Sequence, residues 1–172
     1  MNLERKRIDC ALIVTLAAVL CAPVLIPTWP LMFFAPFLII LFYQKSYIAC
    51  LWASLTAGLV LDLMSSQTHF GLYATSYVAT AALLYKQRYN FFADRISTLP
   101  LMTFFFSVLA TLLQIALIYA FEQKAGGISW HWLLTDLVAM PLLDAGFGFF
   151  FFVLPLLLFG RRVRLGKEYF SE

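Results

Sequence analysis

Hydrophobic residues fill most of this chain in long runs, and short polar segments separate the runs. The runs lack the alternation of apolar and polar residues that a membrane β-strand shows, because one face of a barrel strand meets lipid and the other meets the lumen. Helices satisfy every backbone hydrogen bond inside a bilayer without such alternation. Against the roughly 20 residues needed to cross the hydrocarbon, the runs predict six transmembrane helices, at residues 8–26, 30–43, 47–64, 72–85, 99–121 and 140–159.

The second and fourth predicted spans are short, so they would thin the bilayer, sit buried among their neighbours or extend beyond these bounds. The composition agrees with a membrane protein. Of all residues, 63% are hydrophobic and 12% are charged, whereas about a quarter of the residues in a soluble domain are charged. No low-complexity linker or repeat divides the chain. We therefore expect residues 1–172 to form a single all-α integral membrane domain.

Basic residues set the predicted orientation in the membrane. Six spans place both termini on one side, and positive charge collects on the cytoplasmic side of membrane proteins. Lys124 alone falls on the opposite side, and the other eleven of the 12 basic residues share the side of the termini, namely Arg5, Lys6, Arg7, Lys45, Lys86, Arg88, Arg95, Arg161, Arg162, Arg164 and Lys167. The sequence therefore predicts that both termini are cytoplasmic.

The remaining polar segments have simple interpretations. We interpret the amino terminus as the start of an uncleaved first helix, because its apolar run is too long for a signal peptide and no cleavage site follows. Basic and aromatic residues in segments 86–97 and 161–164 are interfacial anchors, although the tail could also contact an acidic partner, and nucleic-acid binding is not expected. Residues 129–139 should lie along the outer surface and bend into the last span near Pro141, with His131 facing solvent.

Two predicted spans carry patterns that favour close packing. In the third span Ala49, Ala53 and Ala57 recur at every fourth position beside Gly58, and small residues let helix backbones approach closely. One face of the fifth span carries four polar residues, Thr103, Ser107, Thr111 and Gln114. We interpret these polar residues as hydrogen-bonding groups between helices, in preference to a transport path.

Asp62 and Asp144 are carboxylates inside predicted spans. A charged side chain in a membrane helix costs several kcal/mol unless a partner or a watery cavity surrounds it, so each is a candidate functional or structural residue. Asp62 lies two residues from the outer end of the third span, and Asp144 lies about one turn inside the outer end of the sixth. We expect both at one depth, where they could face one cavity, with Asp62 accepting hydrogen bonds from the loop at residues 65–68.

A pair of membrane carboxylates could act as the acid and base of an aspartyl protease. However, the sequence lacks the Gly-Asp pair of prepilin peptidases and the asparagine-rich motifs of lipoprotein signal peptidase. The three cysteines and two histidines also lack metal-ligand spacing. We therefore expect no enzymatic activity, no catalytic residue, no metal and no cofactor.

The stretch from Gly58 to Ser65, GLVLDLMS, followed by GLYATSY at residues 71–77, resembles the central motif of the MreD family of rod shape-determining proteins. Length, six spans, cytoplasmic termini and a short basic and aromatic loop after the fourth span also resemble that family. The chain departs from the family pattern at Ser66, where glycine is common, and in a segment one residue longer before Gly71. The resemblance assigns Asp62, Gly71 and Leu72 to the family motif, whereas Asp144 is selected by its membrane cost.

The resemblance implies a non-enzymatic component of the bacterial cell-elongation complex, located in the cytoplasmic (inner) membrane, that regulates cell shape and peptidoglycan synthesis. The implied partners are an MreC-like protein, an MreB-like filament, RodA and a penicillin-binding protein. The implied fold resembles the substrate-binding subunits of energy-coupling-factor transporters, so the alternative function is a transporter subunit that binds a vitamin or another small molecule. A vitamin cavity needs convergent polar groups, and few lie near the outer side.

Overall fold

The computed structural model describes residues 8–25, 32–65, 70–87, 97–122 and 134–154, and every regular element within these ranges is helical. In chain order the helices are α1 (Ile8–Leu25), α2 (Ala35–Gln44), α3 (Tyr47–Met64), α4 (Leu72–Gln87), α5 (Thr98–Glu122), η3 (Thr135–Ala139), α7 (Met140–Gly148) and η4 (Phe149–Val153). The prediction of an all-α protein is confirmed for these ranges, and each predicted apolar run contains a helix.

Three described helical segments are long and apolar enough to cross a membrane: Tyr47–Met64, Thr98–Phe121 and Thr135–Val153. The apolar segments Ala11–Cys21 and Ala35–Gln44 are shorter. Helix length and composition therefore support a membrane protein, whereas six complete spans stay a prediction. Large apolar side chains are exposed along α1 and at the end of α5, as expected of helix surfaces that face lipid.

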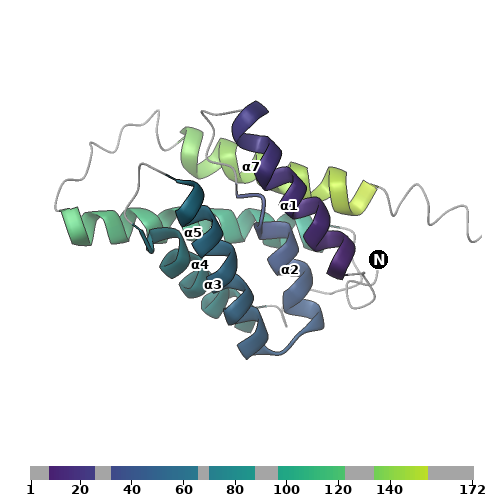
Figure 1. Ribbon diagram of the computed structural model, residues 1–172, viewed down its shortest axis with the longest axis horizontal. Helices are drawn as coiled ribbons and strands as arrows, with labels where there is room; N and C mark the ends of the chain where they lie inside the picture. The colour runs from purple at the N-terminus through teal and green to yellow at the C-terminus, as the bar shows by residue number, and fades with distance from the viewer. Residues whose placement is uncertain (1–7, 26–31, 66–69, 88–96, 123–133, 155–172) are drawn as a thin grey trace, which may run out of the picture.

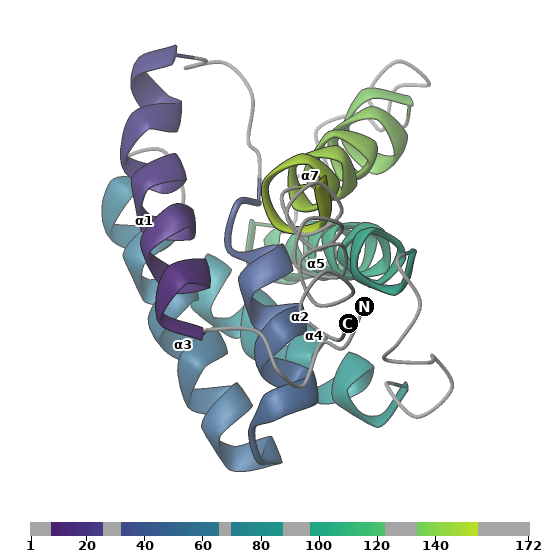
Figure 2. The same cartoon turned by 90° about the vertical axis from the view of Figure 1, so that its right-hand side faces the viewer.

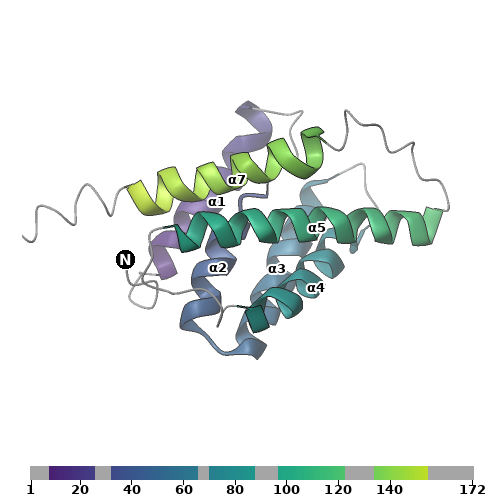
Figure 3. The ribbon, with the colours of Figure 1, turned by 180° about the vertical axis from the view of Figure 1, so that it is seen from behind.

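The helices form two crossing sets. α5 and the helix made of η3, α7 and η4 lie side by side, and α1, α2 and α3 cross them steeply (Figures 1 and 2). α3 and α4 form the most extensive helix pair, and α4 also packs on α5. From behind, α5 runs across α2, α3 and α4 (Figure 3). The pair of α3 and α4 is thus joined to the rest of the molecule largely through α5.

The short helix α2 forms the centre of the core. Its residues from Ala35 to Phe42 are all buried, and it contacts α1, α3, α5 and α7. Ten residues of helix extend about 15 Å, which is half of the roughly 30 Å hydrocarbon thickness. Of the three possibilities for a short second span, the structure shows a helix buried among its neighbours.

The last helix begins earlier than predicted. It is continuous through residues 134–154, with π-helical turns at Thr135–Ala139 and Phe149–Val153. Pro141 has no backbone N–H, and a wider π-helical turn directly before it accommodates the missing hydrogen bond. The helix therefore begins before Met140, the predicted start of the last span, and residues 135–139 are part of it. The expected position of residues 129–139 along the outer surface stays a prediction.

Several other predictions fall on residues outside the described ranges. They concern the basic amino terminus at residues 1–7, most of the cytoplasmic segment 86–97, the outer residues 129–133 with His131, and the basic tail at 161–164.

Close contact between α3 and α4 depends on Gly58. A Cβ atom at this position would lie 2.5 Å from the Cα of Ala74 and 2.8 Å from the carbonyl oxygen of Tyr73, closer than atoms of this kind can approach. The buried face of α3 comprises Cys50, Ser54, Ala57, Gly58 and Asp62. The buried face of α3 therefore differs in part from the predicted small-residue face. Ala57 and Gly58 are buried, whereas Ala49 and Ala53 are only partly buried.

Gly58→Ala should destabilise the protein, because the added methyl group meets the backbone of α4. Overpacking of this kind costs about 1–3 kcal/mol. Gly146→Ala is the matched control, since no atom lies within 4 Å of a Cβ at that position and alanine favours a helix over glycine by about 1 kcal/mol. Thermal unfolding in detergent compares the two variants. If Gly58→Ala melted at or above the wild-type temperature, the close contact at Gly58 would be wrong.

Candidate functional site

The Asp62 carboxylate caps α4 from the end of the neighbouring helix. Its Oδ1 accepts a hydrogen bond from the backbone N–H of Tyr73, and its Oδ2 accepts one from the N–H of Ala74, each at 3.0 Å. Both N–H groups belong to the first turn of α4, where no carbonyl of the same helix can reach them. The negative charge of the 5% exposed side chain also interacts favourably with the helix dipole. Asp62 therefore binds the end of α3 to the start of α4.

Gly71 gives the chain the turn that starts α4. Its φ angle is +96°, in the left-handed region that glycine adopts without steric cost. The Gly71 carbonyl accepts hydrogen bonds from both the N–H and the hydroxyl of Thr75, at 2.9 and 2.8 Å. Leu72 follows as a buried side chain. The motif residues Gly58, Asp62, Gly71 and Leu72 thus meet at one place, which we call the α3–α4 junction.

The expected donors to Asp62 were loop residues 65–68, and the observed donors are Tyr73 and Ala74. Residues 66–68 lie outside the described ranges. The sequence signal for the observed donors was the start of an apolar run directly after Gly71, because the first N–H groups of any helix need acceptors.

Asp144 joins three segments in the interior. It is 2% exposed, its Oδ1 accepts the backbone N–H of Met32 at 2.8 Å, and its Oδ2 accepts the Ser107 hydroxyl at 2.6 Å. The Met32 carbonyl in turn accepts the N–H of Ala35, the first residue of α2. Asp144 therefore holds the start of α2 against α5 and α7. The Met32 N–H had no signal in the sequence, because any residue can supply a backbone donor.

The two carboxylates occupy different positions along their helices. Asp144 lies halfway along the candidate span Thr135–Val153, because that helix begins before Pro141. Asp62 lies within one turn of the end of α3. The common depth of the two carboxylates in the membrane stays a prediction. The hydrogen bonds described for each carboxylate come from different donors, so each carboxylate joins its own set of helices.

The predicted polar face of α5 divides into two kinds of residue. The hydroxyls of Thr103 and Thr111 donate to carbonyls of their own helix, at Leu99 and Ser107. Ser107 bonds to Asp144, and the Gln114 side-chain amide donates to the Ser76 hydroxyl at 3.5 Å, so these two reach other helices. Interhelical bonding is thus confirmed for half of the predicted set.

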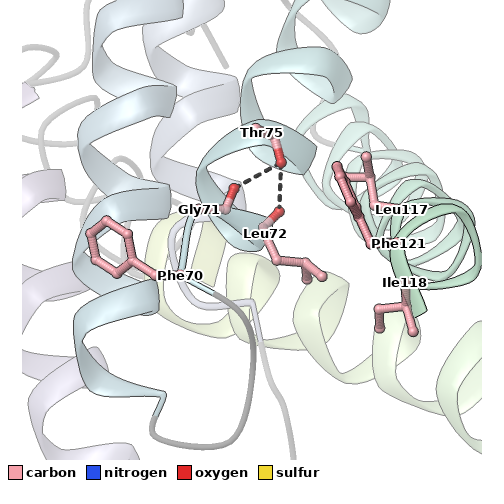
Figure 4. Close-up of a pocket in the computed structure, with 7 residues that line it drawn as sticks. All are labelled: Phe70, Gly71, Leu72, Thr75, Leu117, Ile118 and Phe121. Carbon is pink, nitrogen blue, oxygen red and sulfur yellow. Dashed lines mark hydrogen bonds between the residues drawn. The ribbon is translucent and has the colours of Figure 1, made fainter.

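An open pocket of about 500 Å³ lies between the start of α4 and the end of α5 (Figure 4). Its lining residues are Phe70, Gly71, Leu72, Thr75, Leu117, Ile118 and Phe121. Thr75 carries the polar side chain of this lining, and its hydroxyl is bonded to the carbonyls of Gly71 and Leu72. Neither Asp62 nor Asp144 lines the pocket. Its chemistry therefore suits an apolar group.

The described residues contain no group of three or more His, Cys, Asp or Glu side chains that could hold a metal ion. No family model, curated protein or solved structure matches this chain. The comparisons therefore add no support to the MreD resemblance, which rests only on the residues of segment 58–77.

Asp62→Leu should lower the stability by about 1–3 kcal/mol, because it leaves two N–H groups at the start of α4 without their charged acceptor. Asp62→Asn should be milder, since its amide oxygen still accepts one of the two bonds. The control is Asp9→Leu, which changes an exposed carboxylate in α1 and should shift stability by no more than about 0.5 kcal/mol. Melting temperature and membrane abundance measure all three. Equal behaviour of all three variants would contradict the capping role.

Proposed function

We propose that this chain is a non-enzymatic membrane component of the bacterial cell-elongation complex, which regulates cell shape and peptidoglycan synthesis. The observation that carries the proposal is the convergence of Gly58, Asp62, Gly71 and Leu72 at the α3–α4 junction. These residues belong to the stretch that resembles the MreD motif. Their contacts determine how α3 packs on α4. Such a structural role is what we expect of a motif in a non-enzymatic protein that binds other membrane proteins.

The proposed setting is the cytoplasmic membrane, crossed six times with both termini inside. The biased distribution of Lys and Arg supports this topology. Exposed apolar side chains, among them Leu20 and Phe121, would offer contact surfaces to lipid and to the membrane helices of a partner. By the resemblance, the partners would be an MreC-like protein, an MreB-like filament, RodA and a penicillin-binding protein.

The alternative function is a transporter subunit that binds a vitamin or another small molecule. The pocket between α4 and α5 is of a suitable size, because small-molecule sites commonly measure about 300–1,000 Å³. Such sites also place a few polar groups to orient the ligand, whereas the Thr75 hydroxyl is already bonded inside α4. The lining therefore favours the first proposal over a vitamin site.

The topology proposal predicts that alkaline phosphatase fused after Glu172 is inactive, because the enzyme needs an oxidising compartment to form its disulfides. The same reporter inserted within residues 66–69 should be active. A cytoplasmic fluorescent protein fused after Glu172 serves as the control for expression and insertion. An active carboxyl-terminal phosphatase fusion would eliminate the arrangement with six spans and both termini inside.

The functional proposal predicts that depletion of the protein in its host makes cells round or misplaces their division planes. The tagged protein purified in mild detergent should carry an MreC-like partner in near-stoichiometric amount, as identified by mass spectrometry. An unrelated multi-span protein with the same tag, expressed at the same level, controls for nonspecific association. Asp62→Leu controls for loss through misfolding.

Normal cell shape after depletion, together with a stoichiometric vitamin in the purified protein, would favour the transporter subunit instead. Extraction of the purified protein with organic solvent, followed by mass spectrometry of small molecules, makes that comparison on the same sample.

A further inference from the structure

Tyr77 in α4 holds a buried hydroxyl that has no described protein partner. Its side chain has 0% exposure, and its Oη makes no hydrogen bond within the described part of the chain. The ring is fixed edge-on against Phe106 of α5, with centroids 5.3 Å apart, so the hydroxyl cannot swing freely to another site. An unpaired hydroxyl buried in this way costs about 1–3 kcal/mol, and such a group requires a physical explanation.

The Asp144 carboxylate lies in the same part of the interior as the Tyr77 side chain, because the two contact consecutive residues of α5, Ser107 and Phe106. Each of its oxygens accepts one described hydrogen bond, from Met32 to Oδ1 and from Ser107 to Oδ2. A carboxylate has about four acceptor positions, so two are still able to accept. Ser107 directly follows Phe106, the residue that packs on the Tyr77 ring. A buried donor and a buried acceptor therefore lie near each other without a direct bond.

We propose that the Tyr77 hydroxyl and the Asp144 carboxylate form a binding site for one buried water molecule. The water would accept the hydrogen bond of Tyr77 and donate one to Asp144. The Ser107 oxygen can accept its second hydrogen, which gives the three bonds that buried waters typically make. An apolar ligand would leave the Tyr77 hydroxyl without a partner.

This water completes a polar connection among four helices. Asp144 already joins α7 to α5 through Ser107 and to the start of α2 through Met32. The water adds α4 through Tyr77, so that the α3–α4 pair is tied to the centre of the core. The inference concerns the interior of the protein and is independent of the proposed role in cell elongation.

The test is the sign of the effect of Tyr77→Phe on thermal unfolding of the full chain in detergent. If the hydroxyl has no partner, its removal leaves the melting temperature unchanged or raises it. With a water bridge, Tyr77→Phe should lower the melting temperature by about 2–4 °C. Tyr47→Phe is the matched control, because Tyr47 is 42% exposed and the loss of its hydroxyl should have little effect.

A double-mutant cycle with Asp144→Asn identifies the partner of the hydroxyl. The bridge predicts that Tyr77→Phe and Asp144→Asn are non-additive, since either change disturbs the same water. Additive effects, or a Tyr77→Phe variant as stable as wild type, would overturn the proposal.

Infrared spectroscopy of the wild-type protein detects the water itself. The bridge predicts an O–H stretch that shifts when the protein is equilibrated in H₂¹⁸O and that is missing in the Tyr77→Phe variant. Coupling without this band would mean that Tyr77 bonds Asp144 directly, and would also overturn the proposal. If Tyr77→Phe did not fold, the wild-type spectrum would be compared with that of Asp144→Asn. A water band present in wild type and altered in Asp144→Asn would support the bridge, and its absence from wild type would overturn it.

Discussion

Contact between the backbones of α3 and α4 at Gly58 is the constraint on which the contacts of α4 with Asp62 and with α5 depend. The missing side chain lets the start of α4 lie directly against α3, and this approach brings the first N–H groups of α4 within reach of Asp62 one turn further along. α4 then presents Tyr77 to Phe106 and Ser76 to Gln114, both on α5. A wider separation at Gly58 would therefore weaken the cap and alter how the pair docks on α5.

Buried carboxylates accept hydrogen bonds from backbone N–H groups at two places in this fold. A helix that starts in apolar surroundings has N–H groups without acceptors, and water is not available to satisfy them. Asp62 supplies the acceptor for α4, and Asp144 supplies it for the Met32 N–H just before α2. The positive end of the α4 dipole stabilises Asp62 in return. Asp62 thus accepts hydrogen bonds from the start of the neighbouring helix, and Asp144 accepts one from a segment distant in sequence.

The sequence predicted the helices well because long apolar runs leave few alternatives to a helix. It also selected Asp62 and Asp144, since carboxylates in such runs are costly without partners. It did not predict their partners. Those are backbone N–H groups, which every residue other than proline carries, so that only the three-dimensional path of the chain selects Met32, Tyr73 and Ala74. The early start of the last helix was missed because Pro141 normally ends or kinks a helix, and a π-helical turn before it is not visible in a hydrophobic pattern.

Most serine and threonine hydroxyls in the described helices donate to a backbone carbonyl of their own helix. Thr15, Ser54, Thr80, Thr103 and Thr111 each donate to a carbonyl four residues earlier in their own helix. These hydroxyls therefore have no hydrogen left to donate to a polar ligand, and the same is true of Thr75 beside the pocket. The polar groups that reach between helices are concentrated at the α3–α4 junction and around Asp144. A ligand-binding subunit needs polar groups that remain available to its ligand, whereas most polar groups described here are engaged in bonds within or between helices.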